Sequence, residues 1–119
     1  MSTNITVTVT GSPNNYSVAV SPNKLKIDSD GSIVWQAGTG TGTVAFTFDT
    51  TAPVSFVGSH APLTNPVYVA GNTVSCTDTV SGDGTYPYVL TLWVGTEKIT
   101  WPSVTHVGNG DPEIHNDPK

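Results

Sequence analysis

Four residues of this chain have side chains that commonly bind transition metals: His60, His106, His115 and the single cysteine, Cys76. Imidazole nitrogen and thiolate sulfur are ligands that suit zinc and copper. None of the four lies at a short ligand spacing such as Cys-x-x-Cys, so distant segments would have to meet, above all those of His106 and His115. Cys76 also alternates with Val74, which favours a small buried side chain. A non-blue metal site is therefore an alternative hypothesis rather than the leading one.

Two other segments resemble ligand-binding loops only in part. Residues 28–32 (DSDGS) begin like a calcium loop, but the third acidic ligand and the glutamate at loop position twelve are missing. Residues 38–43 (GTGTGT) lack the lysine of a phosphate-binding loop, and no helical pattern follows them. The chain has no nucleophile elbow either. The sequence predicts a protein that is not an enzyme and uses no cofactor.

Aromatic side chains are the remaining candidates for binding, because aromatic rings carry much of the buried area in interfaces. Trp93 lies on the opposite face of its predicted strand from Leu90 and Leu92, so something else must cover it. Trp101 lies beside Pro102 at a predicted strand end. We predict these two tryptophans as binding residues for a protein partner or, alternatively, for a carbohydrate.

Charge is the least usual part of the composition. Only 11% of the residues are charged, the formal net charge is −5, and the cations are four lysines with no arginine. Nucleic-acid binding depends on clustered lysine and arginine, so the chain is not expected to bind DNA or RNA. Threonine, serine, asparagine and glycine must supply most of the polar surface, as is typical of β-sandwiches.

Compartment and membrane association also follow from composition. A single cysteine cannot form an intrachain disulfide, and the first residues (MSTNITVTVTG) lack the charged and apolar regions of a signal peptide. No apolar run approaches the roughly 20 residues of a membrane helix. We therefore predict a cytoplasmic protein that does not bind membranes.

Hydrophobic residues recur with a period of two, which indicates β-strands, and no window has the periodicity of a helix. The predicted strands are residues 5–10, 16–20, 25–27, 32–37, 44–48, 73–78, 86–94, 97–101 and 112–115. Asp30 and Gly31 are predicted to form a hairpin turn. Residues 50–72 contain several prolines, which predicts an irregular connection with at most short edge strands. The strand over residues 86–94 is apolar on both faces and is predicted to be central, with Leu90 buried between two sheets.

These elements predict an all-β fold, a Greek-key sandwich of about seven to nine strands. One domain spans residues 1–115, followed by a polar tail at residues 116–119.

The order of three motifs resembles the cupredoxin fold. In that fold a Val-x-Trp strand and a Gly-x-Tyr-x-Tyr strand flank the copper end. KIDSDGSIVWQAG at residues 26–38 resembles the first of these, with Ile33 at the valine position, and GTYPYVL at residues 84–90 matches the second. The ending GDPEIHNDPK is similar to the Asp-Pro-x-Ile-x-Asn terminus of uncharacterised bacterial cupredoxin-like proteins. The resemblance implies a cupredoxin-like sandwich.

The ligands of a blue-copper site are absent from the matching positions. Such a site needs two histidines, a thiolate and usually an axial methionine. Leu90 occupies the position of the cysteine, Trp93 lies where the second histidine belongs, and the only methionine is Met1. Residues 36–43 contain no first histidine. The resemblance therefore implies a scaffold without type 1 copper. We predict a non-catalytic interaction or assembly module that has a protein partner or forms a homodimer through an edge strand or the apolar former metal end.

Overall fold

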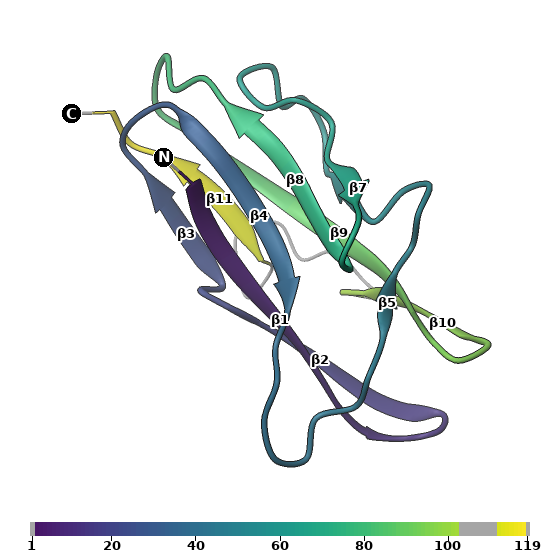
Figure 1. The fold of residues 1–119 in the computed structure, drawn as a ribbon. Coiled ribbons are helices and arrows are strands. Elements are labelled where there is room, and N and C mark those ends of the chain that lie inside the picture. The colour runs from purple at the N-terminus through teal and green to yellow at the C-terminus, as the bar shows by residue number, and fades with distance from the viewer. Residues whose placement is uncertain (1, 103–111, 119) are drawn as a thin grey trace.

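The computed structural model describes residues 2–102 and 112–118, and within them eleven strands form two sheets with no helix. Sheet I has the order β2-β1-β4-β8-β7, and sheet II has the order β10-β9-β11-β3, with β5 and β6 also paired to β9. Figure 1 shows the two sheets as layers. The all-β prediction is confirmed, and there are more strands than expected because the proline-containing connection contributes short ones.

The strands of sheet I are β1 (Ser2–Ser12), β2 (Asn15–Ser21), β4 (Gly31–Ala37), β7 (Val67–Val69) and β8 (Thr73–Asp78). Those of sheet II are β3 (Lys24–Ile27), β5 (Thr47–Phe48), β6 (Val54–Phe56), β9 (Gly84–Val94), β10 (Glu97–Trp101) and β11 (Glu113–Asn116).

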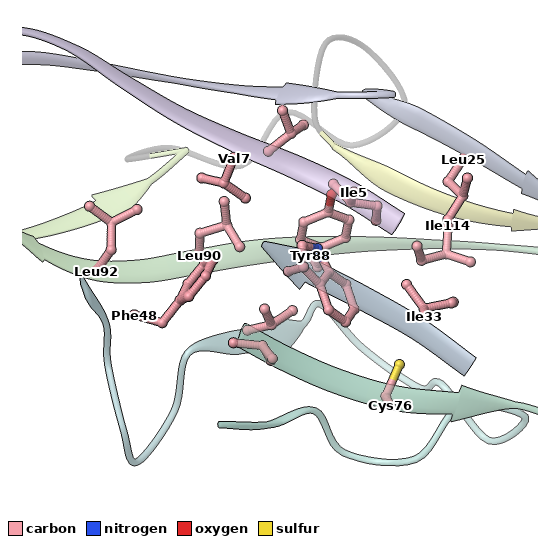
Figure 2. Close-up of a cluster of buried hydrophobic side chains, with 14 of the residues drawn as sticks. Ile5, Val7, Leu25, Ile33, Phe48, Cys76, Tyr88, Leu90, Leu92 and Ile114 are labelled. Atoms are coloured by element: carbon pink, nitrogen blue, oxygen red, sulfur yellow. The ribbon is translucent and has the colours of Figure 1, made fainter. Parts of the chain in front are cut away.

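The core lies between the sheets and consists of the apolar half of each alternating strand. In β1, for example, Ile5, Val7 and Val9 are fully buried while the threonines between them face outward. Removing this apolar surface from water is the main term that stabilises the fold. Figure 2 shows side chains from both sheets meeting in one cluster. Other fully buried members are Ile33, Trp35, Phe48, Val74, Tyr88, Leu90, Leu92 and Ile114.

Strand β9 is the central strand of sheet II, as predicted. Leu90 pairs with Val54 of β6 on one edge and with Trp101 of β10 on the other. Leu90 is 0% exposed, which confirms its expected position between the sheets.

The β1–β2 hairpin is closed by a tight turn at Pro13 and Asn14. Asn14 has φ of 67°, a left-handed conformation that asparagine tolerates better than most residues. Gly11 precedes the turn with φ of 109°, and a Cβ there would overlap the backbone of Asn15. The hairpin fixes the register in which β2 forms one edge of sheet I.

The hairpin turn predicted at Asp30 and Gly31 is wrong. Strand β3 pairs with β11 in sheet II, whereas β4 pairs with β1 and β8 in sheet I, so residues 28–30 cross from one sheet to the other. Asp30 Oδ1 accepts a hydrogen bond of 2.8 Å from the backbone N–H of Val80 and so attaches this crossing to the end of β8. Aspartate and glycine favour a change of direction, but they do not specify which sheet the next strand joins.

Two element boundaries also differ from the expectation. The strand expected over residues 44–48 is reduced to β5, although Val44 N still donates to Val9 O at 2.8 Å. At the other end, β11 continues through Asn116, which is fully buried, so the strand extends one residue beyond the expected end of the domain at 115. In the part of the chain that the structure describes, no helix is long and apolar enough to cross a membrane.

Candidate functional site

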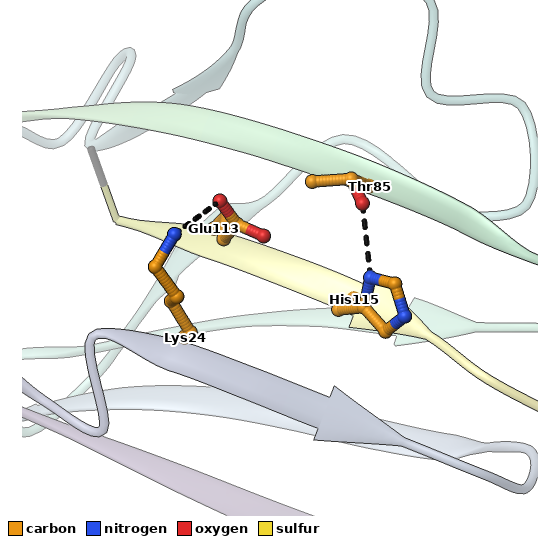
Figure 3. A network of polar contacts seen from close by, with 4 residues as sticks. All are labelled: Lys24, Thr85, Glu113 and His115. Carbon is orange, nitrogen blue, oxygen red and sulfur yellow. Dashed lines mark hydrogen bonds and ion pairs between the residues drawn. The ribbon is translucent and has the colours of Figure 1, made fainter. Parts of the chain in front are cut away.

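The metal-ligand candidates that the structure describes lie on three separate elements. His60 follows β6, where its Nε2 is 2.9 Å from Asn65 Oδ1 and its ring packs on Phe56 with centroids 4.8 Å apart. His115 lies on β11, and its Nδ1 is 2.9 Å from the Thr85 hydroxyl (Figure 3). Cys76 is buried on the inner face of β8. His106 lies outside the described residues. Among residues 2–102 and 112–118, no three histidine, cysteine or acidic side chains are arranged to hold a metal ion.

Cys76 is a protonated thiol at neutral pH. Burial, reinforced by the nearby Asp78 carboxylate, raises the pKa of the Cys76 thiol to about 12. Only the thiolate is a nucleophile or a good metal ligand. The side chain therefore acts as a small hydrophobic residue in the core, as its alternation with Val74 predicts.

Trp93 lies on the outer face of sheet II. Its indole Nε1–H donates a hydrogen bond of 3.0 Å to Asp49 Oδ1, while Asp49 Oδ2 accepts from the backbone N–H of Ala52 at 2.8 Å. Lys98 Nζ lies over the ring, 5.9 Å from its centroid. A sugar that stacked on this face would have to displace the Lys98 ammonium group.

Trp101 is not the exposed platform that its strand-end position suggests. It pairs directly with Leu90, and residues opposite each other in an antiparallel pair share a face. Trp101 therefore lies on the inner side of sheet II, where it is half-buried against the core cluster. The two tryptophans predicted as binding residues lie on opposite faces of sheet II.

The contact between Trp93 and Asp49 can be tested by titration. The Trp93 hydrogen bond is the main cause that lowers the pKa of Asp49, followed by the bond from Ala52. We expect Trp93→Phe to raise the Asp49 pKa toward its ordinary value, because phenylalanine has no N–H to donate. The measurement is the pH titration of the Asp49 carboxyl carbon by NMR, with Trp101→Phe as a control that leaves it unchanged. An unaltered titration in Trp93→Phe would show that this hydrogen bond does not form.

The edges of the two sheets differ in how they are protected against pairing with another strand. In sheet II, β3 carries Lys24 and Lys26, β10 carries Glu97 and Lys98, and β5 and β6 are very short. Figure 3 shows that Lys24 extends from β3 to the Glu113 carboxylate, a contact of 3.1 Å. Charges and short lengths are common protections of sheet edges.

Sheet I has one long edge without such protection. Strand β2 has seven residues (NYSVAVS), none of them charged, and within the described chain it pairs only with β1. The opposite edge, β7, has three residues and exposes two valines, Val67 at 61% and Val69 at 44%. The sequence predicts contact through an edge strand but does not single out β2. The available signal is the uncharged run at residues 15–21 beside a turn.

A buried polar pair connects the sheets at the end of β8. Asn116 Nδ2 donates a hydrogen bond of 2.8 Å to Asp78 Oδ1, and both side chains are almost fully buried. Among the residues that the structure describes, Asp78 Oδ2 and Asn116 Oδ1 have no hydrogen-bond partner. Burial raises the pKa of Asp78, and the Asp30 charge adds to this effect, while the Asn116 bond opposes it. Asp78 also lines a cavity of about 60 Å³ beneath the crossing between β3 and β4.

Comparisons with known proteins give no family to which the chain can be assigned. No protein-family model matches the sequence, and no curated protein matches it.

Proposed function

We propose that the protein is a non-catalytic interaction or assembly module that acts by adding a strand to the edge of sheet I. The observation that carries the proposal is the β2 edge, which is seven residues long and uncharged. An unpaired edge presents backbone donors and acceptors to solvent and can pair with another strand. Strand addition is a common mode of protein recognition in which backbone hydrogen bonds contribute the affinity.

A cupredoxin-like scaffold without type 1 copper is part of the proposal. Leu90 occupies the position where the resemblance places the copper-binding cysteine, and its side chain is packed in the core. The inner face at this point is filled by Leu92 and Phe48 as well. This apolar packing supports a structural rather than a metal-binding use of the fold. A cytoplasmic location is also proposed, supported by the lone reduced cysteine, Cys76.

The proposal is tested by the mass of the protein in solution. We expect sedimentation of the wild-type chain from micromolar to millimolar concentration to show a mass that rises above that of the monomer. A variant that places lysines on both edges of sheet I, Ser17→Lys, Ala19→Lys, Val67→Lys and Val69→Lys, should remain monomeric, because like charges oppose pairing. Circular dichroism would confirm that the variant is folded. A wild-type chain that keeps the monomer mass over the whole range would overturn assembly as its function.

A further inference from the structure

The hydrogen bonds of β1 determine which backbone groups of β2 remain open. Gly38 N donates to Val7 O at 2.7 Å and Val44 N donates to Val9 O at 2.8 Å, both on the side of β1 that faces away from β2. Successive residues of a strand direct their backbone groups to opposite edges. The even-numbered residues of β1 therefore bond to β2.

The register then identifies the open residues. Thr8 of β1 is opposite Ala19 and Thr10 is opposite Ser17, so Ala19 and Ser17 direct their N–H and C=O groups toward β1. The intervening residues of β2 direct theirs away from the sheet. Within the described chain these open residues are Tyr16, Val18 and Val20.

We propose that the partner of this edge is the β2 strand of a second copy, paired antiparallel about a two-fold axis at Val18. This inference rests on the proposed function and names its partner. In this register Val18 meets the partner's Val18, and Tyr16 meets the partner's Val20, so every open residue of the edge is paired. An axis at Ser17 or at Ala19 would leave one of the three without its counterpart. The two five-stranded sheets would become one continuous sheet across the dimer.

The side chains of β2 are compatible with this self-pairing. On the inner face, the partner's Val20 would cover the half-exposed ring of Tyr16, which buries apolar surface. On the outer face, the small side chains of Ser17 and Ala19 are opposite each other. No charge repels a second copy along the strand, although each chain carries a net charge of −5.

Charged side chains lie beyond both ends of β2. Asn14 N, in the turn before β2, donates to Glu97 Oε1 at 3.2 Å, which places a carboxylate at one end of the strand. Lys24 follows the other end, where its Nζ is 3.1 Å from Glu113 Oε1 while its side chain remains 54% exposed. Antiparallel pairing brings the first end of one copy to the second end of its partner, so Glu97 of one copy approaches the ion pair of Lys24 and Glu113 in the other.

Disulfide trapping tests the register directly. In the proposed dimer Ser17 and the partner's Ala19 form a non-hydrogen-bonded pair, for which the Cα atoms are about 4.5 Å apart and within the range of a disulfide. We expect an equimolar mixture of Ser17→Cys and Ala19→Cys chains, oxidised by glutathione disulfide, to give cross-linked dimers. Either variant alone would place its cysteines on a diagonal at about 7–8 Å and should cross-link much less. Native Cys76 is buried and should not take part.

The possible results separate the register of the pairing, the edge that is used and the assembly function. Cross-linking that is stronger in one single variant than in the mixture would show a different register and overturn the axis at Val18. A second experiment locates the edge without cysteines: Ser17→Lys with Ala19→Lys should abolish association, whereas Val67→Lys with Val69→Lys, which adds the same charge to the β7 edge, should preserve it. The reverse pattern would place the contact on β7 and overturn the inference while the assembly function stands. A wild-type chain that never associates would overturn assembly as the function, and this inference with it.

Discussion

Replacing Leu90 with alanine is expected to lower the free energy of unfolding by about 2–5 kcal/mol, the range for a large-to-small change in a packed core. Leu90 is 0% exposed at the centre of β9, with neighbouring strands on both edges. Figure 2 shows its side chain in the cluster that contains Val7 and Phe48. The removed methyl groups would leave a cavity that neighbours held by two sheets cannot close.

Denaturant unfolding monitored by circular dichroism measures the effect of Leu90→Ala. Val67→Ala is the matched control, because Val67 is 61% exposed and its truncation should change stability by less than about 0.5 kcal/mol. A loss below about 1 kcal/mol in Leu90→Ala would contradict the burial of this side chain between the sheets.

Asp78→Asn is expected to make the protein more stable than the wild type at neutral and higher pH. When Asp78 is ionised, Asp78 Oδ2 and Asn116 Oδ1 are both buried acceptors to which no group in the described part of the chain donates. A neutral amide at position 78 can donate to Asn116 Oδ1 while it still accepts from Asn116 Nδ2. The gain should be about 1–3 kcal/mol, the typical cost of an unsatisfied buried polar group.

The pH dependence of this difference follows from the direction of the Asp78 pKa. The pKa is raised in the folded protein, so the folded state holds its proton more tightly than the unfolded state. The stability that this proton contributes is fully present below the ordinary aspartate pKa and is lost as the pH rises through the higher, folded value. The advantage of Asp78→Asn should therefore be small in acid and grow across this window.

Unfolding midpoints of the two proteins at a series of pH values measure this trend. Asp83→Asn removes the same charge from an exposed position and serves as the control. If Asp78→Asn were less stable than the wild type at every pH, the native site would accommodate the carboxylate better than a neutral amide, and the expectation would be wrong.

Alternation in the sequence predicts the inner face of most strands correctly, because a strand's period of two depends only on local geometry. It places Ile5, Val7 and Val9 in the core and Leu90 between the sheets. It does not predict that β3 and β4 belong to different sheets. That choice depends on pairing with β11 and β8, residues distant in sequence that no local pattern specifies.

The candidate site was predictable only in part for the same reason. Whether an edge is open depends on the neighbours of each strand, so the sequence indicates an edge contact without identifying β2. Trp101 looks exposed beside a proline, yet its register with Leu90 turns it inward. The sequence does indicate that Asp78 is buried, since it shares the alternating face of Val74 and Cys76. Its hydrogen-bond partner Asn116 is 38 residues away, and no local pattern identifies it.

The position of β11 has a consequence for synthesis on the ribosome. This strand, near residue 116, lies between β9 and β3, and within the described residues it is the only strand hydrogen-bonded to β3. Strand β3 is translated early. It cannot pair with β11 until nearly ninety further residues have emerged from the ribosome. Sheet I can assemble once β8 is complete, whereas sheet II closes only when β11 leaves the exit tunnel. Sheet II therefore remains incomplete in the nascent chain. Contacts between residues so far apart in sequence also form slowly.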